Sequence, residues 1–381
     1  MRTPLAYLNL VHERTRLIVA IAGVAFAVIL VFMNLGFLGS LAKTASLFYR
    51  QMNADIFLIS PQALEITTTK AFPIERLYQA AGVAGVERTM PLYMGYLQWR
   101  NPETGKSRGI FAFGFNLNDP AFLLPELQDP TNLAILRQPD TVFIDKFSRP
   151  EYGPQTAGTE TEVDRRRVVI GGQYALGGAF AADATLIMSD QNYRRYFDPI
   201  PLRLVNLGLV KLEPGADLEV VLAKLRQVLP ADVRVLGIED MIKSDRDYWI
   251  GTTSTGFIFG LGVAVSCVVG VVIVYQILYT DISSHMKQYA TLKAMGYRSR
   301  YLFVTVLQEA VILSVMGYIP GFIVSLGLYE LTTQATSGGL PISMELGRAI
   351  AVFVLTMAMC SLSGLISVNK VVSADPADVF S

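Results

Sequence analysis

Residues 281–322 read DISSHMKQYATLKAMGYRSRYLFVTVLQEAVILSVMGYIPGF, and this stretch shows how the chain is built. Its first part is polar and basic, whereas its second part is a long apolar run in which Glu309 is the only charged residue. An apolar run of this length is enough to cross a hydrocarbon layer of ~30 Å. The stretch therefore predicts a membrane span that follows a short basic connection.

The chain contains three more apolar runs of this kind. Residues 17–42, 250–280 and 349–368 carry no charged side chain, and residues 301–329 form the run already described. The first run is longer than the apolar core of a signal peptide, which has about 7–15 residues, so we interpret it as an uncleaved anchor. The sequence thus predicts four transmembrane helices.

The composition agrees with a membrane protein that also has a soluble part. Charged residues make up 17% of the 381 residues, below the quarter that is usual in soluble domains, and the deficit falls in the four apolar runs. The net charge of +0 gives no indication of nucleic-acid binding. Residues 43–249 contain neither His nor Cys, which excludes the usual nucleophile–histidine sites and zinc sites there. We expect no catalytic residue, metal or cofactor.

The basic residues predict the orientation of the spans. They concentrate before the first run and between the second and third, whereas residues 330–348 contain a single one, Arg348. Because basic flanks stay in the cytoplasm, both termini are predicted to be cytoplasmic, and residues 43–249 to lie outside. The other predicted segments are a cytoplasmic amphipathic stretch (1–16), a cytoplasmic connection (281–300), a short periplasmic loop (330–348) and a cytoplasmic tail (369–381).

The large insertion reads as an α+β domain on a helical stalk. Strands are predicted at 55–60, 93–100, 107–115, 167–170, 204–212 and 233–236, and helices at 217–229 and 239–248. We expect a base and a distal lobe at about 116–201. Apolar residues continue past the first span at spacings of 3, 4, 3 and 4, the period of a coiled-coil seam, and predict the stalk: Leu38, Leu41, Ala45, Phe48 and Met52. The fold class is a polytopic α-helical membrane protein with four transmembrane helices and this inserted domain.

One tripeptide is similar to part of a nucleotide-binding motif. Gly105, Lys106 and Ser107 match the end of a phosphate-binding loop, but Arg100 stands where that motif requires a glycine. We interpret the tripeptide as a polar turn in a hairpin. The chain is therefore not expected to bind ATP by this route, or to be an enzyme by itself.

The stretch at residues 281–322 resembles the signature of ABC transporter permeases of the MacB/FtsX/LolC type. That family has a charged helix with a TLKAMG-like run, a basic pair, a Gln-Glu inside the next span and a glycine-rich stretch. The loop TTQATSGGLPISM at 332–344 and the tail DPADVF at 375–380 are most similar to the DevC permeases of tripartite exporters.

The resemblance implies a permease subunit that works by mechanotransmission. A separate ABC ATPase subunit would bind two copies of the chain, and ATP hydrolysis would move the periplasmic domains. The cargo would be lipid-like or otherwise amphiphilic, exported through a periplasmic membrane-fusion adaptor and an outer-membrane channel. The alternative within the family is an FtsX-like scaffold that regulates a cell-wall hydrolase without transporting anything.

The connection at 281–300 is the predicted ATPase coupling helix. The resemblance places the contacts on one segment: Met286, Lys287, Tyr289, Leu292, Lys293, Met295 and Gly296. Gly296 is suited to end a helix. The other interpretation of this segment is a basic juxtamembrane helix held by anionic membrane lipid.

Small residues predict close helix packing inside the spans. Gly256 and Gly260 form one face of the second span, Gly262, Ser266 and Gly270 form another, and Gly317 and Gly321 repeat the spacing on the third span. The sequence leaves open whether these faces meet the same chain or a second copy. Glu309, an intramembrane carboxylate, is either a structural brace that pairs with Lys287 or Lys293, or a proton or substrate site.

Overall fold

A computed structural model describes residues 14–177, 182–284, 291, 295, 299–336 and 340–373. The chain divides into two compact units. The helical unit comprises Met1–Gly39, Ser254–Thr332 and Ile342–Ser381, and the sheet unit comprises Ser40–Thr253 and Thr333–Pro341.

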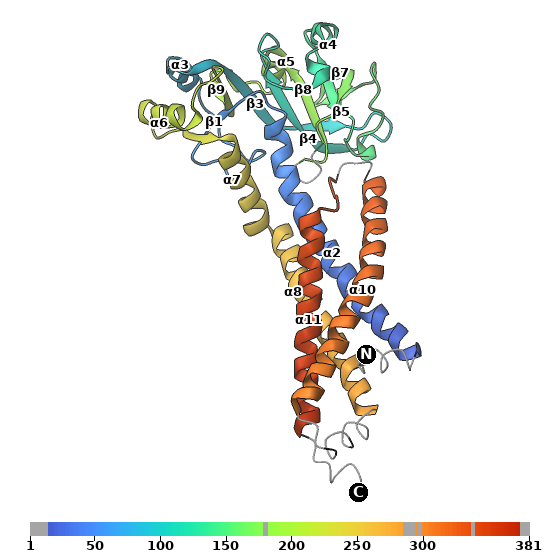
Figure 1. The fold of residues 1–381 in the computed structure, drawn as a ribbon. Helices are drawn as coiled ribbons and strands as arrows, with labels where there is room; N and C mark the ends of the chain where they lie inside the picture. The colour runs from blue at the N-terminus through green and yellow to red at the C-terminus, as the bar shows by residue number, and fades with distance from the viewer. Residues whose placement is uncertain are drawn as a thin grey trace. The chain divides into compact units, whose positions relative to one another are not determined.

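Four long apolar helices dominate the helical unit (Figure 1). They are α2 (Arg14–Arg50), α8 (Ser254–Ser284), α10 (Ser299–Ala335) and α11 (Leu346–Ser373). Within the described residues, these are the four helices that are long and apolar enough to cross a membrane. All four extend beyond the predicted spans at one end or both. The second span was predicted from residue 250, but that residue still belongs to α7 (Ile238–Gly251), and α8 begins only at Ser254.

Helix α2 packs with the other three long helices of the helical unit. Its apolar side chains Val24, Val28, Val31 and Phe32 are buried, and they pack with residues of α8, α10 and α11 in one hydrophobic cluster. Mean hydropathy is high around each helix, which is typical of helices that contact other helices on one side and lipid on the other.

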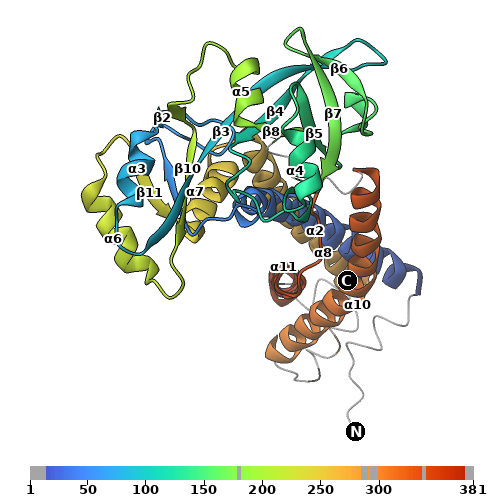
Figure 2. The ribbon, with the colours of Figure 1, turned by 90° about the horizontal axis from the view of Figure 1, so that it is seen from above.

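The sheet unit is built on one mixed nine-stranded sheet (Figure 2). Its strand order is β11-β1-β10-β3-β4-β8-β5-β7-β6. β4 pairs with β8 and β5 with β7 in parallel, whereas the remaining neighbours are antiparallel. The strands are β1 (Ile56–Ile59), β3 (Val86–Arg100), β4 (Ser107–Phe115), β5 (Thr141–Asp145), β6 (Glu160–Val163), β7 (Arg166–Tyr174), β8 (Thr185–Ser189), β10 (Leu207–Leu212) and β11 (Arg234–Gly237). A separate pair joins β2 (Phe72–Pro73) and β9 (Leu204–Val205).

Successive side chains of a strand point to opposite faces of the sheet, so apolar residues lie on both faces. Helices pack on both of these faces. In β1, Ile56 and Leu58 belong to one hydrophobic cluster and Phe57 and Ile59 to the other. The first face carries α3 (Glu75–Ala81), α5 (Asp190–Tyr196) and α6 (Leu218–Val228), and the second carries α4 (Pro130–Leu136), α7 and the end of α2. Two short 3-10 helices, η1 (Pro125–Leu127) and η2 (Pro150–Tyr152), lie in the connections.

Several predicted elements of the inserted domain are confirmed. The hairpin of β3 and β4 is present, and Asp217 caps α6 by accepting hydrogen bonds from the N–H groups of Glu219 and Val220. Where the sequence predicted a base and a distal lobe, the structure has a single sheet that extends through both, because β4 pairs with β8 as well as with β3.

Candidate functional site

Between Met286 and Gly296, the part of the coupling segment with the predicted contacts, the structure describes residues 291 and 295. Met286, Lys287, Tyr289, Leu292, Lys293 and Gly296 lie outside the described residues, and so does Ala45 of the stalk as regards its side chain. Met295 is exposed, and its N–H donates a hydrogen bond of 3.0 Å to the carbonyl of Thr291, the spacing of an α-helix. The role of this segment therefore stays a prediction.

One small-residue face of α8 contacts α2 and α11. A Cβ added to Gly262 would overlap Oδ1 of Asn34, and one added to Gly270 would lie 3.1 Å from Cβ of Ala27 and 3.2 Å from the sulfur of Met359. A side chain at either position would require its neighbours to shift. Ser266, on the same face, is buried.

Asn34 supplies a polar contact at this interface that the sequence analysis did not identify. Its Nδ2 donates to the carbonyl of Leu30 at 2.9 Å and to Oγ of Ser266 at 3.4 Å, while the Ser266 hydroxyl donates to the carbonyl of Gly262 at 2.7 Å. Hydrogen bonds between apolar helices stabilise a specific pairing. The sequence signal that could have predicted this contact is the position of Asn34, a polar residue inside the apolar run 17–42.

The other predicted small faces differ from one another. Gly317 and Gly321 of α10 face α2, because added Cβ atoms would lie 2.5 Å from Val24 and 2.8 Å from Val28. Gly260 of α8 is exposed, with no heavy atom of the described structure within 4 Å of an added Cβ. Gly256 is buried. The face with Gly262 and Gly270 and the face with Gly317 and Gly321 thus pack against other helices of the same chain, whereas Gly260 faces away from the described helices.

Glu309 is completely buried in α10. The packing beside it is close, since an added Cβ on Gly364 of α11 would lie 3.2 Å from Cβ of Ala310. Its two predicted partners, Lys287 and Lys293, lie outside the described residues. The choice between a brace and a proton or substrate site therefore stays open.

The predicted stalk residues fall in both units. Leu38 lies in the helical unit and is half-buried, whereas Leu41, Phe48 and Met52 lie in the sheet unit and are buried. Met52 follows the end of α2 and forms a β-bridge with Phe122 instead of continuing the helix. The apolar spacing therefore marks residues that enter the core of the sheet unit.

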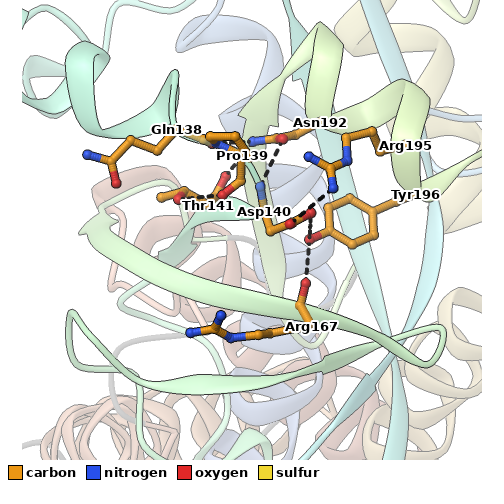
Figure 3. Close-up of polar contacts among 8 residues, drawn as sticks. All are labelled: Gln138, Pro139, Asp140, Thr141, Arg167, Asn192, Arg195 and Tyr196. Atoms are coloured by element: carbon orange, nitrogen blue, oxygen red, sulfur yellow. Dashed lines mark hydrogen bonds and ion pairs between the residues drawn. The ribbon is translucent and has the colours of Figure 1, made fainter.

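A second polar network joins α5 to β5 and β7, near one edge of the sheet (Figure 3). Asn192 of α5 is buried; its Nδ2 donates to the carbonyls of Gln138 and Thr141, both at 3.0 Å, and its Oδ1 accepts from the N–H of Asp140 at 3.1 Å. Asp140 has a positive φ of 59°, a conformation that Asp tolerates better than most residues. The Tyr196 hydroxyl donates to the carbonyl of Arg167 at 3.0 Å. The network fixes α5 against β5 and β7.

A third network joins the end of α2 to α7. The Tyr49 hydroxyl donates a hydrogen bond of 2.7 Å to Oδ2 of Asp245, and both side chains are buried. Among the described residues, no group of three or more His, Cys, Asp or Glu side chains is arranged to hold a metal ion. The Tyr49–Asp245 hydrogen bond joins two helices of the sheet unit.

Part of the helical unit matches a known protein family. Residues 260–376 match the family model of the FtsX-like permease C-terminal domain. The match includes most of α8, all of α10 and α11, and the connection between α8 and α10. A search of curated protein sequences gave no match.

Two solved structures are similar to part of the chain. The periplasmic region of MacB from Actinobacillus actinomycetemcomitans is 10% identical, with a TM-score of 0.36, over 54% of this chain and 96% of that one. The extracellular domain of the noncanonic ABC-type transporter YknZ from Gram-positive bacteria is 14% identical, with a TM-score of 0.35, over 49% of this chain and all of that one (100%). Residues 260–376 of the chain are thus similar to the C-terminal domain of FtsX-like permeases.

Proposed function

We propose that the chain is the membrane subunit of an ABC exporter and transmits ATP hydrolysis by a separate ATPase into movement of its inserted domain. The observation that carries the proposal is the FtsX-like match over residues 260–376, which includes the predicted coupling segment and the helices on both sides of it. The proposed ATPase is a separate subunit, as the similarity to FtsX-like permeases implies.

The packing of the helical unit supports a route for the movement. α8 and α10 flank the predicted coupling segment, and both pack glycines closely against α2. Tightly packed helices move as a body rather than deform, since interiors have few voids. A push on the segment at 281–300 would therefore act on α2, whose residues after Gly39 belong to the sheet unit.

The proposed assembly contains two copies of the chain. The outward position of Gly260 on α8, beside exposed Leu261 and Val265, is a surface suited to a second copy or to lipid. The termini would be cytoplasmic and the sheet unit periplasmic, where an adaptor and an outer-membrane channel would receive a lipid-like cargo, as in DevC-type exporters.

The test is reconstitution of the full chain in lipid nanodiscs with a candidate ABC ATPase subunit from the same organism. The chain alone should hydrolyse no ATP, and it should stimulate the ATPase when added. Hydrolysis by the purified chain, or an ATPase that neither binds nor responds, would contradict the proposal. Stimulation accompanied by activation of a cell-wall hydrolase, with no lipid released, would favour the scaffold role instead.

A further inference from the structure

Three buried polar side chains meet where the end of α2, the turn at residues 60–68 and α7 come together in the sheet unit. Tyr49 comes from α2, Glu65 from the turn and Asp245 from α7, and their exposed fractions are 0%, 2% and 1%. Acidic side chains are almost never buried to this degree unless they are paired. Two of them in one buried site therefore call for a physical explanation.

Asp245 ties the three segments together through one oxygen atom. Its Oδ2 accepts the hydrogen bond from the Tyr49 hydroxyl at 2.7 Å and another from the N–H of Ile66 at 3.1 Å. Glu65 is held in place by its own turn, accepting from the N–H of Thr67 at 2.9 Å and from the hydroxyl of Thr68 at 2.6 Å. The contact thus joins two helices and a turn that are far apart in the sequence.

The titratable groups that face Asp245 from the packed segments are Tyr49 and Glu65. Two cations on the same helices have other partners at the surface: Arg50 pairs with Glu239 at 3.2 Å, and Arg246 lies 3.6 Å from Asp247. Burial, opposed by the Tyr49 hydrogen bond and reinforced by the negative charge of Glu65, raises the pKa of Asp245 to about 7.

We propose that the Tyr49–Asp245–Glu65 cluster is a proton-controlled latch that holds α2, α7 and the 60–68 turn together when Asp245 carries a proton. Loss of that proton places two negative charges side by side in a buried site, and opening of the contact relieves both their repulsion and their desolvation. α7 leads through Thr252 and Thr253 into α8. A role of the latch in gating the transmitted movement rests on the proposed function, whereas the latch itself does not.

The direction of the pH effect follows from the two states of Asp245. In the open state its pKa is the ordinary value of 3.8, and in the closed state it is about 7. The closed state therefore binds more protons between these values, and its stability falls as the pH rises from about 4 to about 7. The opening equilibrium increases by up to tenfold for each pH unit in this window and is constant above it. The latch is tightest in acid.

The experiment is hydrogen–deuterium exchange of the full chain in phosphatidylcholine nanodiscs, followed in the peptide that covers residues 60–68 and corrected for intrinsic rates. Between pH 5 and pH 7, protection in the wild type should fall by up to about 100-fold, which is two pH units of the linkage. Asp245→Asn keeps the acceptor oxygen but removes the charge, so its protection should stay high and constant. Asp240→Asn, exposed on the same helix, is the matched control and should behave as the wild type does.

Glu65→Gln supplies an independent check, because removal of the neighbouring charge lowers the pKa of Asp245. In this variant, the fall in protection with rising pH should therefore stop at a lower pH than in the wild type. Infrared spectra of the wild type should also contain a protonated-carboxyl band that disappears through about pH 7. Equal protection of the wild type at pH 5 and pH 7, an unchanged pH dependence in Asp245→Asn, or the absence of that band would overturn the latch. None of these measurements involves an ATPase or a cargo, so they are separate from the test of the proposed function.

Discussion

Gly262 shows how one missing side chain sets the contact between α2 and α8. The Oδ1 atom of Asn34 occupies the space that the Cβ atom of any other residue would take at position 262. Gly260, only two residues away, has open space at the same position. The two glycines thus have different roles although both belong to small-residue patterns.

These neighbours make a matched pair for mutation. Gly262→Leu should destabilise the helical unit by about 1–3 kcal/mol, because the larger side chain overpacks the interface with Asn34. Gly260→Leu should leave the stability of the single chain unchanged. Thermal unfolding of both variants in detergent checks the expectation, and equal melting temperatures would show that Gly262 and Asn34 do not pack closely.

Asn192 contributes to the stability of the sheet unit through three buried hydrogen bonds. Asn192→Ala leaves the carbonyls of Gln138 and Thr141 and the N–H of Asp140 without this partner inside the sheet unit. A buried polar group that loses its partner costs about 1–3 kcal/mol. The melting temperature of the full chain should fall, whereas Gln191→Ala, an exposed change on the same helix, should leave it unaltered.

At the scale of elements, the connection between α8 and α10 is central to the proposed mechanism. It joins two helices that both pack on α2. Its stiffness and its contact with an ATPase are expectations from the sequence, since most of it lies outside the described residues.

Leu292→Asp tests this connection directly. A charge at a desolvated interface should cost roughly 2–4 kcal/mol, which weakens ATPase binding by roughly 30- to 1000-fold. Insertion into the membrane should survive, because residue 292 lies outside every predicted span. Titration of the ATPase onto nanodiscs measures the affinity. A variant that inserts, binds and stimulates as the wild type does would assign the segment to lipid contact.

At the scale of the whole molecule, the question is which parts face which side of the membrane. The four candidate spans are an even number, and the basic residues favour cytoplasmic termini. The sheet unit would then lie outside the cell membrane as a single body, because one sheet extends through it.

Cysteine labelling of intact cells tests the orientation. In a background without Cys267 and Cys360, Glu160→Cys should react with an impermeant maleimide added from the periplasm, because position 160 is exposed on the sheet unit. Lys293→Cys should react only after the inner membrane is permeabilised. The reverse pattern would invert the topology.

The sequence determined the features that depend on one segment at a time. Length without charge predicted four apolar helices, and four such helices are present among the described residues. The resemblance at residues 281–322 is confirmed by the FtsX-like match. It could be recognised from the sequence because the motif consists of residues that are neighbours in the chain. Alternation and turn residues predicted the β3–β4 hairpin and the Asp217 cap, because both are set by neighbours in the chain.

The tertiary structure decided the features that depend on distant segments. Strands β5, β6 and β8 and helices α3, α4 and α5 were not predicted, because short elements become stable only when the sheet packs around them. The sequence showed several small faces but not that Gly262 and Gly317 face α2 while Gly260 faces away. It also gave no sign that Tyr49, Glu65 and Asp245 meet. Helical and strand periods tell which residues share a face, but only packing determines what that face contacts.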